Sequence, residues 1–458
     1  MIDLVMTMLV VVLLAAGTAL LANTVEFAMR RWVWIGFGWF MVCAIAQLLI
    51  TRVINPEGGD TTMYTERSTE LARYMETSFT FVAPEVFKLL IQQPSGVDNF
   101  PMIVGAGSNT GSMFGVAAFL IYFLAGSDIA AQVLVSGFSY YGALQIYKAF
   151  ADAQPDLDRR KLFIGTVLFP SVGFWTAAMH KESFCLMGVG CCLAAWRGVY
   201  NTKIIRSIIL LALGITLLGL FRPPVIPPIA LGVAVFYLYE RLRRSRGGNA
   251  IVLGPIYLIV AFAVLAAGMV LVSHLDPSLG IDKIGDTMSE KQGQWGKVTA
   301  GSTIDTGDAD PDGVPTTPAA QLARVPFGLL NALLRPQLFD VHNAGTFLGA
   351  LEMTVVGYLL FRAIYGGGVR GILREIEKSP LMLMCTVVTL VGCTFVGLVT
   401  LNLGSLARYR VPFLPFYATF VLSLARQRAP VRSAVELAPR SPLLASGPRI
   451  SPRIPTKT

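Results

Sequence analysis

Long apolar blocks separated by polar turns run through most of this chain. Twelve such blocks can be counted, at about 4–25, 32–50, 101–124, 128–150, 162–179, 183–196, 207–221, 224–239, 251–273, 345–365, 381–401 and 411–425. A helical membrane span needs about 20 mostly apolar residues, and its backbone must satisfy its own hydrogen bonds because lipid offers none. The blocks are too long for barrel strands. The sequence therefore predicts an all-α fold, a polytopic transmembrane helical bundle of about twelve spans.

Composition supports this prediction. Of the 458 residues, 54% are hydrophobic and only 14% are charged, and the mean hydropathy is +0.61. Soluble domains carry about 25% charged residues, so a single soluble domain and a disordered chain are both excluded. The first apolar block has no small-residue cleavage site before Arg30. We interpret it as a first span and not as a removed signal peptide.

The net charge of +9 is concentrated at the end of the chain. The segment 426–458 holds seven basic residues and one acid, which supplies +6 of the total. A basic segment after the last span is typical of a cytoplasmic end, and its Pro and Ser content favours disorder. Nucleic-acid binding is therefore not expected.

Six cysteines lie in the apolar blocks, and none forms a CxxC pair. We interpret them as small buried hydrophobic residues, because neither a disulfide framework nor a metal site has this spacing.

Lys and Arg in short loops predict the orientation. Basic turns at 159–161, 197–206, 240–249 and 370–378 should be cytoplasmic. The resulting organisation is 1–50, two N-terminal spans; 51–100, a first outer loop with interfacial or re-entrant helices; 101–273, a central transmembrane bundle; 274–344, a large acidic outer loop; 345–425, C-terminal spans; and 426–458, a disordered basic tail. The glycine-rich stretch 105–112 is polar for a lipid-facing helix, which favours a re-entrant or interfacial element there.

Five basic residues run against this bias because they lie beside spans on the predicted outer side: Lys181, Arg222, Arg335, Arg408 and Arg410. Guanidinium forks match phosphate oxygens, and a lysine acts as a point charge. The pattern predicts a shared phosphate-binding site at the outer interface. The alternative is that each side chain snorkels and anchors the end of a span.

An acidic turn, Pro56-Glu57-Gly58-Gly59-Asp60, follows the second apolar block. A carboxylate held at the membrane surface can act as a general base or a metal ligand, or the segment is a solvated turn. Asp60 is the first catalytic candidate and Glu57 the alternate.

No metal-ligand spacing stands out elsewhere. His180, His274 and His342 are scattered, and His180 is either a proton relay or a neutral interfacial residue. The segment 308–313 copies the first half of an EF-hand loop, but Ala319 stands where a bidentate Glu is needed. We interpret this loop as a flexible acidic segment, and a divalent cation remains an open alternative.

The motifs also occur in a characteristic order. Gly59, Asp60 and Tyr64 come first, then Phe-Pro-Ser-x-x-Phe-Trp with Lys-Glu (169–182), Arg222-Pro223, Leu334-Arg335-Pro336, and Asn402-x-Gly with Arg408-x-Arg410. This set resembles bacterial multi-span proteins of surface-polysaccharide assembly and is similar to GT-C-type glycosyltransferases and O-antigen-polymerase-like proteins. The resemblance covers roughly residues 50–425.

The resemblance implies a membrane glycosyltransferase or polymerase at the outer face of the bacterial inner membrane. The partners would be a sugar on a polyprenyl phosphate or diphosphate, a glycan acceptor and membrane lipids. Asp60 would be the base, the five cations would hold the phosphate, and Tyr64, Trp175, Glu182 and Asn402 would support them. No cofactor is expected with certainty. The alternative is a transporter or flippase of a lipid-linked glycan.

Overall fold

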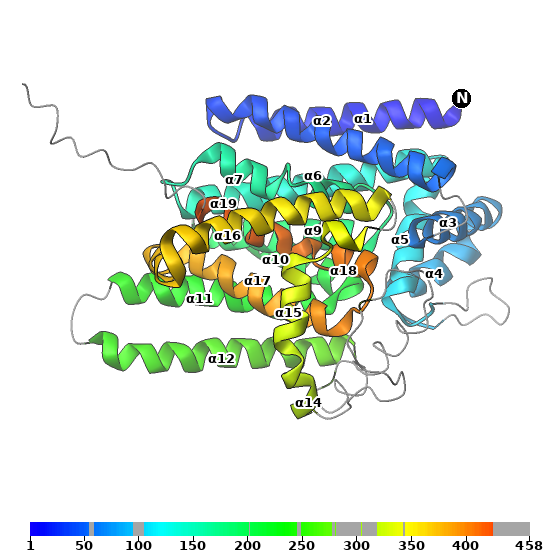
Figure 1. Ribbon diagram of the computed structural model, residues 1–458. Coiled ribbons are helices and arrows are strands. Elements are labelled where there is room, and N and C mark those ends of the chain that lie inside the picture. Colours follow the sequence, from blue (N-terminus) through cyan, green and yellow to red (C-terminus); the bar gives the residue numbers. More distant parts are fainter. Residues whose placement is uncertain are drawn as a thin grey trace, which may run out of the picture. The chain divides into compact units, whose positions relative to one another are not determined.

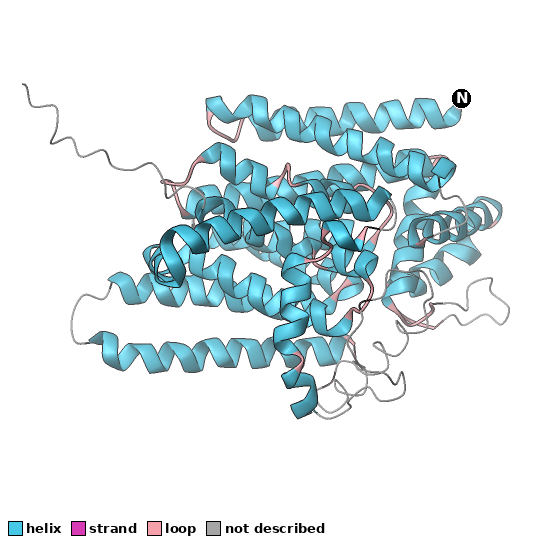
Figure 2. Ribbon diagram, in the orientation of Figure 1, coloured by secondary structure: helices cyan, strands magenta, loops and turns pink. Residues whose placement is uncertain are grey.

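The computed structural model describes residues 1–54, 59–94, 105–200, 202–244, 249–276, 280, 304, 318–341 and 344–424. Every regular element in these ranges is a helix, which confirms the predicted all-α class (Figure 2). The helices are α1 (Ile2–Ala22), α2 (Phe27–Leu49), α3 (Asp60–Thr77), α4 (Phe79–Leu90), α5 (Asn109–Phe123), α6 (Asp128–Ala153), α7 (Arg159–Thr166), α8 (Pro170–Trp175), α9 (Lys181–Tyr200), α10 (Ile204–Phe221), α11 (Ile226–Arg244), α12 (Asn249–Leu275), α14 (Pro318–Ala323), α15 (Val325–Leu334), α16 (Ala344–Lys378), α17 (Pro380–Val399), α18 (Leu403–Tyr409) and α19 (Leu414–Leu424) (Figure 1). Short helical turns are η1 (Ile50–Ile54), η2 (Pro223–Val225), η4 (Leu338–Asp340) and η5 (Val411–Phe413).

Six helical segments in the described ranges are long and apolar enough to cross a membrane. They are Ile2–Ala22, Phe27–Ile54, Ile204–Phe221, Pro223–Arg244, Thr346–Lys378 and Pro380–Val399. A seventh is added if α5 and α6, bent by 115° at their junction, form one broken span. The chain is thus a helical protein with several candidate membrane spans. The count of twelve stays a prediction.

One apolar block differs from the single helix expected. Block 162–179 divides into α7 and α8, with Val167, Leu168 and Phe169 between them. Pro170 starts α8 because proline fits the first helical position but cannot continue a helix. The segment after α8 then leads directly into the start of α9, which carries two of the polar residues described below, Lys181 and Glu182.

Helix α9 packs against both α6 and α10. Its approach to α6 depends on glycine, because a Cβ atom added at Gly190 would lie only 2.4 Å from the carbonyl oxygen of Gly142. Residues 182–186 at its start are all buried. This close packing fixes the position of the first turn of α9 in the protein.

The predicted cytoplasmic turns meet at one end of the helices. Their contacts are Arg159 to Glu26 at 3.1 Å, Arg197 to Asp152 at 3.3 Å, and Arg243 and Tyr239 to the carbonyl groups of Lys378 and Glu377. Distant helix ends at the predicted outer side also meet, as in the 2.6 Å ion pair of Arg52 with Asp128. Each of these contacts joins turns that the sequence places on the same side of the membrane. The topology itself, including which end faces the cytoplasm, stays a prediction.

Helices α3, α4 and α5 pack together within the region where an interfacial or re-entrant element is predicted. The amide of Gln92, just after α4, donates to the carbonyl oxygen of Leu220 at 2.8 Å, which ties this group to the end of α10. The turn from α5 to α6 uses Ala125 and Gly126 with positive φ, and Ser127 caps α6. The 115° bend between the two helices makes them a broken span or a re-entrant loop.

The cysteine prediction is confirmed. All six thiols are free; five of them are buried and Cys192 is half-buried.

Candidate functional site

The position of the Arg222 guanidinium depends on the proline that follows it, Pro223. Helix α10 stops at Phe221, and Arg222 has φ −152° and ψ 71° before Pro223. A residue before proline is pushed out of the helical region, and proline removes the next N–H donor. The break turns the Arg222 side chain toward the start of α9 instead of along the helix surface.

A capped short helix places the second guanidinium. The Asn402 side chain accepts a hydrogen bond from the amide of Ser405 at 3.1 Å and so starts α18. Arg408 lies in the last turn of this helix, and Tyr409 follows it. Asn402 was predicted as a supporting residue, and its observed role is to cap the helix that carries Arg408.

The Gly-Asp turn places the carboxylate. Gly59 precedes α3 with φ +105°, a conformation that L residues other than glycine rarely adopt. Asp60 is consequently the first residue of α3, and 42% of its side chain is exposed.

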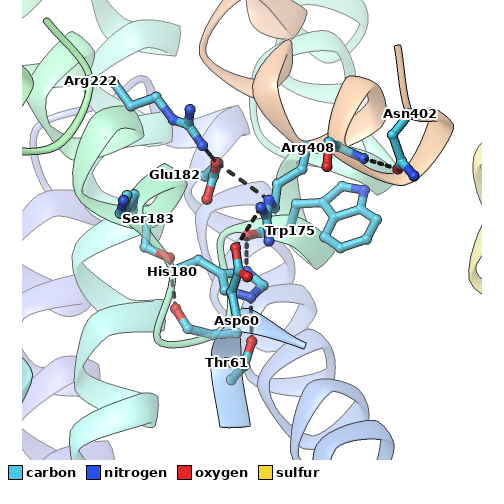
Figure 3. Close-up of polar contacts among 12 residues, drawn as sticks. Asp60, Thr61, Trp175, His180, Glu182, Ser183, Arg222, Asn402 and Arg408 are labelled. Carbon is cyan, nitrogen blue, oxygen red and sulfur yellow. Dashed lines mark hydrogen bonds and ion pairs between the residues drawn. The ribbon is translucent and has the colours of Figure 1, made fainter. Parts of the chain in front are cut away.

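Four of the predicted residues meet in one chain of ion pairs (Figure 3). Asp60 Oδ2 lies 2.6 Å from Arg408 Nη2, and Arg408 Nε lies 3.6 Å from Glu182 Oε1. The same Glu182 oxygen accepts a short hydrogen bond from Arg222 Nη2. Glu182 is buried with 2% of its side chain exposed, and it lies between the two guanidinium groups. Burial alone would raise the pKa of Glu182, but Arg222 and Arg408 lower it to about 2.

Lys181 adds a third cation with a different environment. Its Nζ donates to Thr110 Oγ1 at 2.9 Å and lies 5.8 Å from the centre of the Tyr64 ring. No carboxylate of the described residues lies within ion-pair distance of it. The pKa of Lys181 is lowered to about 8, mainly because the side chain is buried and also because the charge of Arg222 is near. The charge of Glu182 raises this pKa and so offsets part of the effect.

All of these charged side chains except that of Arg408 line a cavity of about 260 Å³. Lining groups include Asp60, Tyr64, Lys181, Glu182 and Arg222, together with Asn109, Pro224, Val225, Asp276, Phe395, Val396, Val399, Thr400, Tyr409 and Phe413. Arg222 stacks on Tyr409, with 3.6 Å from its guanidinium carbon to the ring centre. The cavity is therefore lined by carboxylates, cationic side chains and other hydrogen-bonding groups. Such a lining suits a ligand that carries both an anionic group and hydroxyl groups.

His180 and Thr61 were not predicted to touch. The Nε2 atom of His180 forms a short hydrogen bond with Thr61 Oγ1, and its Nδ1 atom lies 3.3 Å from the Trp175 carbonyl oxygen. Burial, and then Arg408, lowers the pKa of His180 to about 4, so the ring is neutral near pH 7. A neutral interfacial histidine was one of the two interpretations of the sequence. The new finding is that it links the residue after Asp60 to the segment that carries Trp175.

Three predicted phosphate ligands do not line this cavity. Arg408 is joined to it only through its ion pairs with the lining residues Asp60 and Glu182, whereas Arg410 and Arg335 have other partners. Arg410 is fully buried, and its Nη1 donates to the carbonyl oxygens of Ala332, at 3.0 Å, and of Arg335. The Arg335 Nε lies 3.6 Å from Asp340 Oδ2. The structure therefore gives Arg410 a role in holding α15 to the chain after α18. Glu57 lies outside the described residues.

Several lining residues could not be found by sequence reasoning. Asp276 and Asn109 are unremarkable in their local sequences, and only the packing of α12, α5 and α18 brings them to one cavity with Tyr409. Tyr409 alone carried a signal, because it lies between two arginines already noted. Among the described residues, no group of three His, Cys, Asp or Glu side chains is placed to hold a metal ion.

Comparison with known proteins gives no relative. No family model, no curated protein and no solved structure matches this chain.

Proposed function

We propose that this chain is a membrane glycosyltransferase or polymerase of surface-polysaccharide assembly. It would transfer a glycosyl unit from a polyprenyl phosphate- or diphosphate-linked donor to a hydroxyl of a glycan acceptor. The reaction would take place at the outer face of the bacterial inner membrane. The observation that carries the proposal is the cavity that Asp60 and Lys181 share with Arg222.

The chemistry assigns a role to each group. Asp60 accepts the proton of the acceptor hydroxyl, whose oxygen attacks the anomeric carbon of the donor while the bond to the phosphate oxygen breaks. The phosphate leaves with the bonding electrons and gains negative charge. Lys181 contacts it, since it lacks an acidic partner among the described residues, and Arg222 and Arg408 stabilise the charge from fixed positions.

An apolar cavity supports a lipid-linked donor. It measures about 550 Å³ and is walled by α2, α8, α16 and α19, with Trp39, Phe169, Trp175 and Leu348 among its lining residues. Trp175 stacks on His180, with 6.4 Å between the ring centres, and His180 lies just before Lys181 and Glu182. A hydrocarbon chain in this cavity would thus have its phosphate end near the cationic groups.

A transporter or flippase of a lipid-linked glycan is the second candidate. The bend between α5 and α6 favours it, because transporters commonly use broken helices at their substrate sites. In that case Asp60 need not act on a proton.

Asp60→Asn distinguishes the two. It keeps the size of the side chain but removes the basic oxygen. We expect glycan extension on a lipid-linked donor, followed with purified protein in lipid vesicles, to fall by about 10²-fold or more. Asp128→Asn is the matched control, since Asp128 pairs with Arg52 outside the cavity. Extension at the normal rate in Asp60→Asn would remove Asp60 from catalysis. Donor binding without any extension by the unaltered protein would favour the transporter.

A further inference from the structure

One carboxylate holds two arginines that come from distant parts of the chain. Arg222 follows α10 and Arg408 ends α18, yet both contact Oε1 of Glu182 in the first turn of α9. Among the described residues, Arg222 has no other carboxylate within 4 Å. Arg408 has one other acidic partner, Asp60.

The fork geometry of a guanidinium makes the hydrogen bond from Arg222 to Glu182 directional. Arg408 is held by ion pairs instead, with Nη2 at 2.6 Å from Asp60 Oδ2 and Nε at 3.6 Å from Glu182 Oε1, which is longer than a hydrogen bond. Arg222 gives Nη2 to Glu182 while the flat face of its guanidinium covers Tyr409 at 3.6 Å. Arginine donors have a fixed planar arrangement, so a carboxylate on one edge sets the direction of the others.

We propose that Glu182 is a positioning residue that holds Arg222 and Arg408 in place, so that Arg222 keeps its position at the cavity and Arg408 stays paired with Asp60. The catalytic consequence rests on the proposed function. This locking of the two arginines does not, because it depends only on the contacts of a buried carboxylate.

Charge balance is the competing explanation for a buried glutamate here. The ion-pair chain and Lys181 hold three cations and two carboxylates, a formal net charge of +1, and removing Glu182 would make it +2. If balance were its only role, Glu182→Gln would strengthen anion binding and leave both arginines where they are. Positioning predicts instead that both arginines become mobile.

Chemical modification separates these outcomes without any substrate. Phenylglyoxal reacts with accessible arginines, and mass spectrometry of the full-length protein in lipid vesicles gives the rate at each site. Arg73 on α3 is exposed, lies outside the candidate spans and serves as the internal reference. In the unaltered protein Arg222 and Arg408 should react far more slowly than Arg73. In Glu182→Gln Arg222 should react at least about tenfold faster, as expected for loss of a charge-assisted hydrogen bond, and Arg408 should also react faster because it loses the ion pair with the buried carboxylate.

Asp60→Asn supplies the matched comparison, because Asp60 contacts Arg408 but not Arg222. It should raise the reactivity of Arg408 alone. Unchanged protection of both arginines in Glu182→Gln would overturn the proposal, as would equal loosening of both in Asp60→Asn.

Glu182→Asp keeps the charge and shortens the side chain by one methylene. It replaces Glu182→Gln in the same modification experiment if Glu182→Gln does not fold. We expect partial loosening of both arginines. In the transfer assay we expect a fall in kcat of about 10²-fold with little change in KM, the cost of a displacement of roughly 1 Å. Full protection and unchanged kcat in this variant would count against positioning. Absence of transfer by the unaltered protein would defeat the proposed function, whereas the modification pattern would still test the locking.

Discussion

Anion binding at the site should depend on pH through Lys181. Burial, and then the charge of Arg222, lowers the pKa of its ammonium group to about 8, whereas an ordinary lysine titrates near 10.5. The cationic form exists below this pKa and is lost as the pH rises through it. If Lys181 is the main contact of a bound anion, affinity must fall over the same range.

The pKa sets the size of the effect. A group with a pKa of about 8 is about 90% protonated at pH 7 and about 10% protonated at pH 9. Binding that requires the charged form should therefore weaken about tenfold between these values, or by about 1.4 kcal/mol. Neither His180 nor Glu182 contributes, since their pKa values lie near 4 and 2.

Isothermal titration of the protein in lipid nanodiscs with sulfate measures this dependence, because the charge of sulfate is constant from pH 7 to 9. Lys181→Met should bind weakly with a flat profile. Lys88→Met is the matched control, since Lys88 pairs with Glu85 on α4, away from the cavity, and it should keep the normal slope. A flat profile in the unaltered protein, or a normal slope in Lys181→Met, would refute the assignment.

Three further predictions address the fold. Arg410→Met should lower the free energy of unfolding by about 1–3 kcal/mol, because two buried carbonyl groups lose their donor, while sulfate affinity stays normal; weakened sulfate binding in a stable Arg410→Met protein would contradict the structural role. Gly190→Val should lower the free energy of unfolding by about 3 kcal/mol, because the larger side chain forces α9 away from α6. Thermal unfolding in detergent measures this, and Gly38→Val, where a side chain meets open space, should have a much smaller effect. With cysteines introduced at the exposed positions Glu66 and Arg374, an impermeant maleimide added to intact cells should label the first and not the second; the reverse pattern would invert the topology.

Several residues of the candidate site could be predicted one by one, because each has a recognisable local sequence. Arg222 and Arg408 stood out because cations beside spans on the predicted outer side are rare, and Asp60 stood out because it follows a Gly-Gly turn. The structure brings these three together with Lys181 and Glu182. The same local signal also selected Arg410 and Arg335, which lie outside the cavity, because a charge beside an apolar block looks alike whether it faces a ligand or a buried carbonyl group.

The sequence by itself determined the all-helical class and some of the points where helices stop, such as the end of α10 before Arg222-Pro223. Lipid leaves the backbone few alternatives, and proline and glycine act on their immediate neighbours, so both effects are local. Tertiary structure alone decided which residues share the cavity and that one buried glutamate joins two arginines 186 positions apart (408 − 222). Such contacts depend on how α9 packs against α6 and α10, and that packing is set by many small steric fits spread along the chain, such as Gly190 against Gly142.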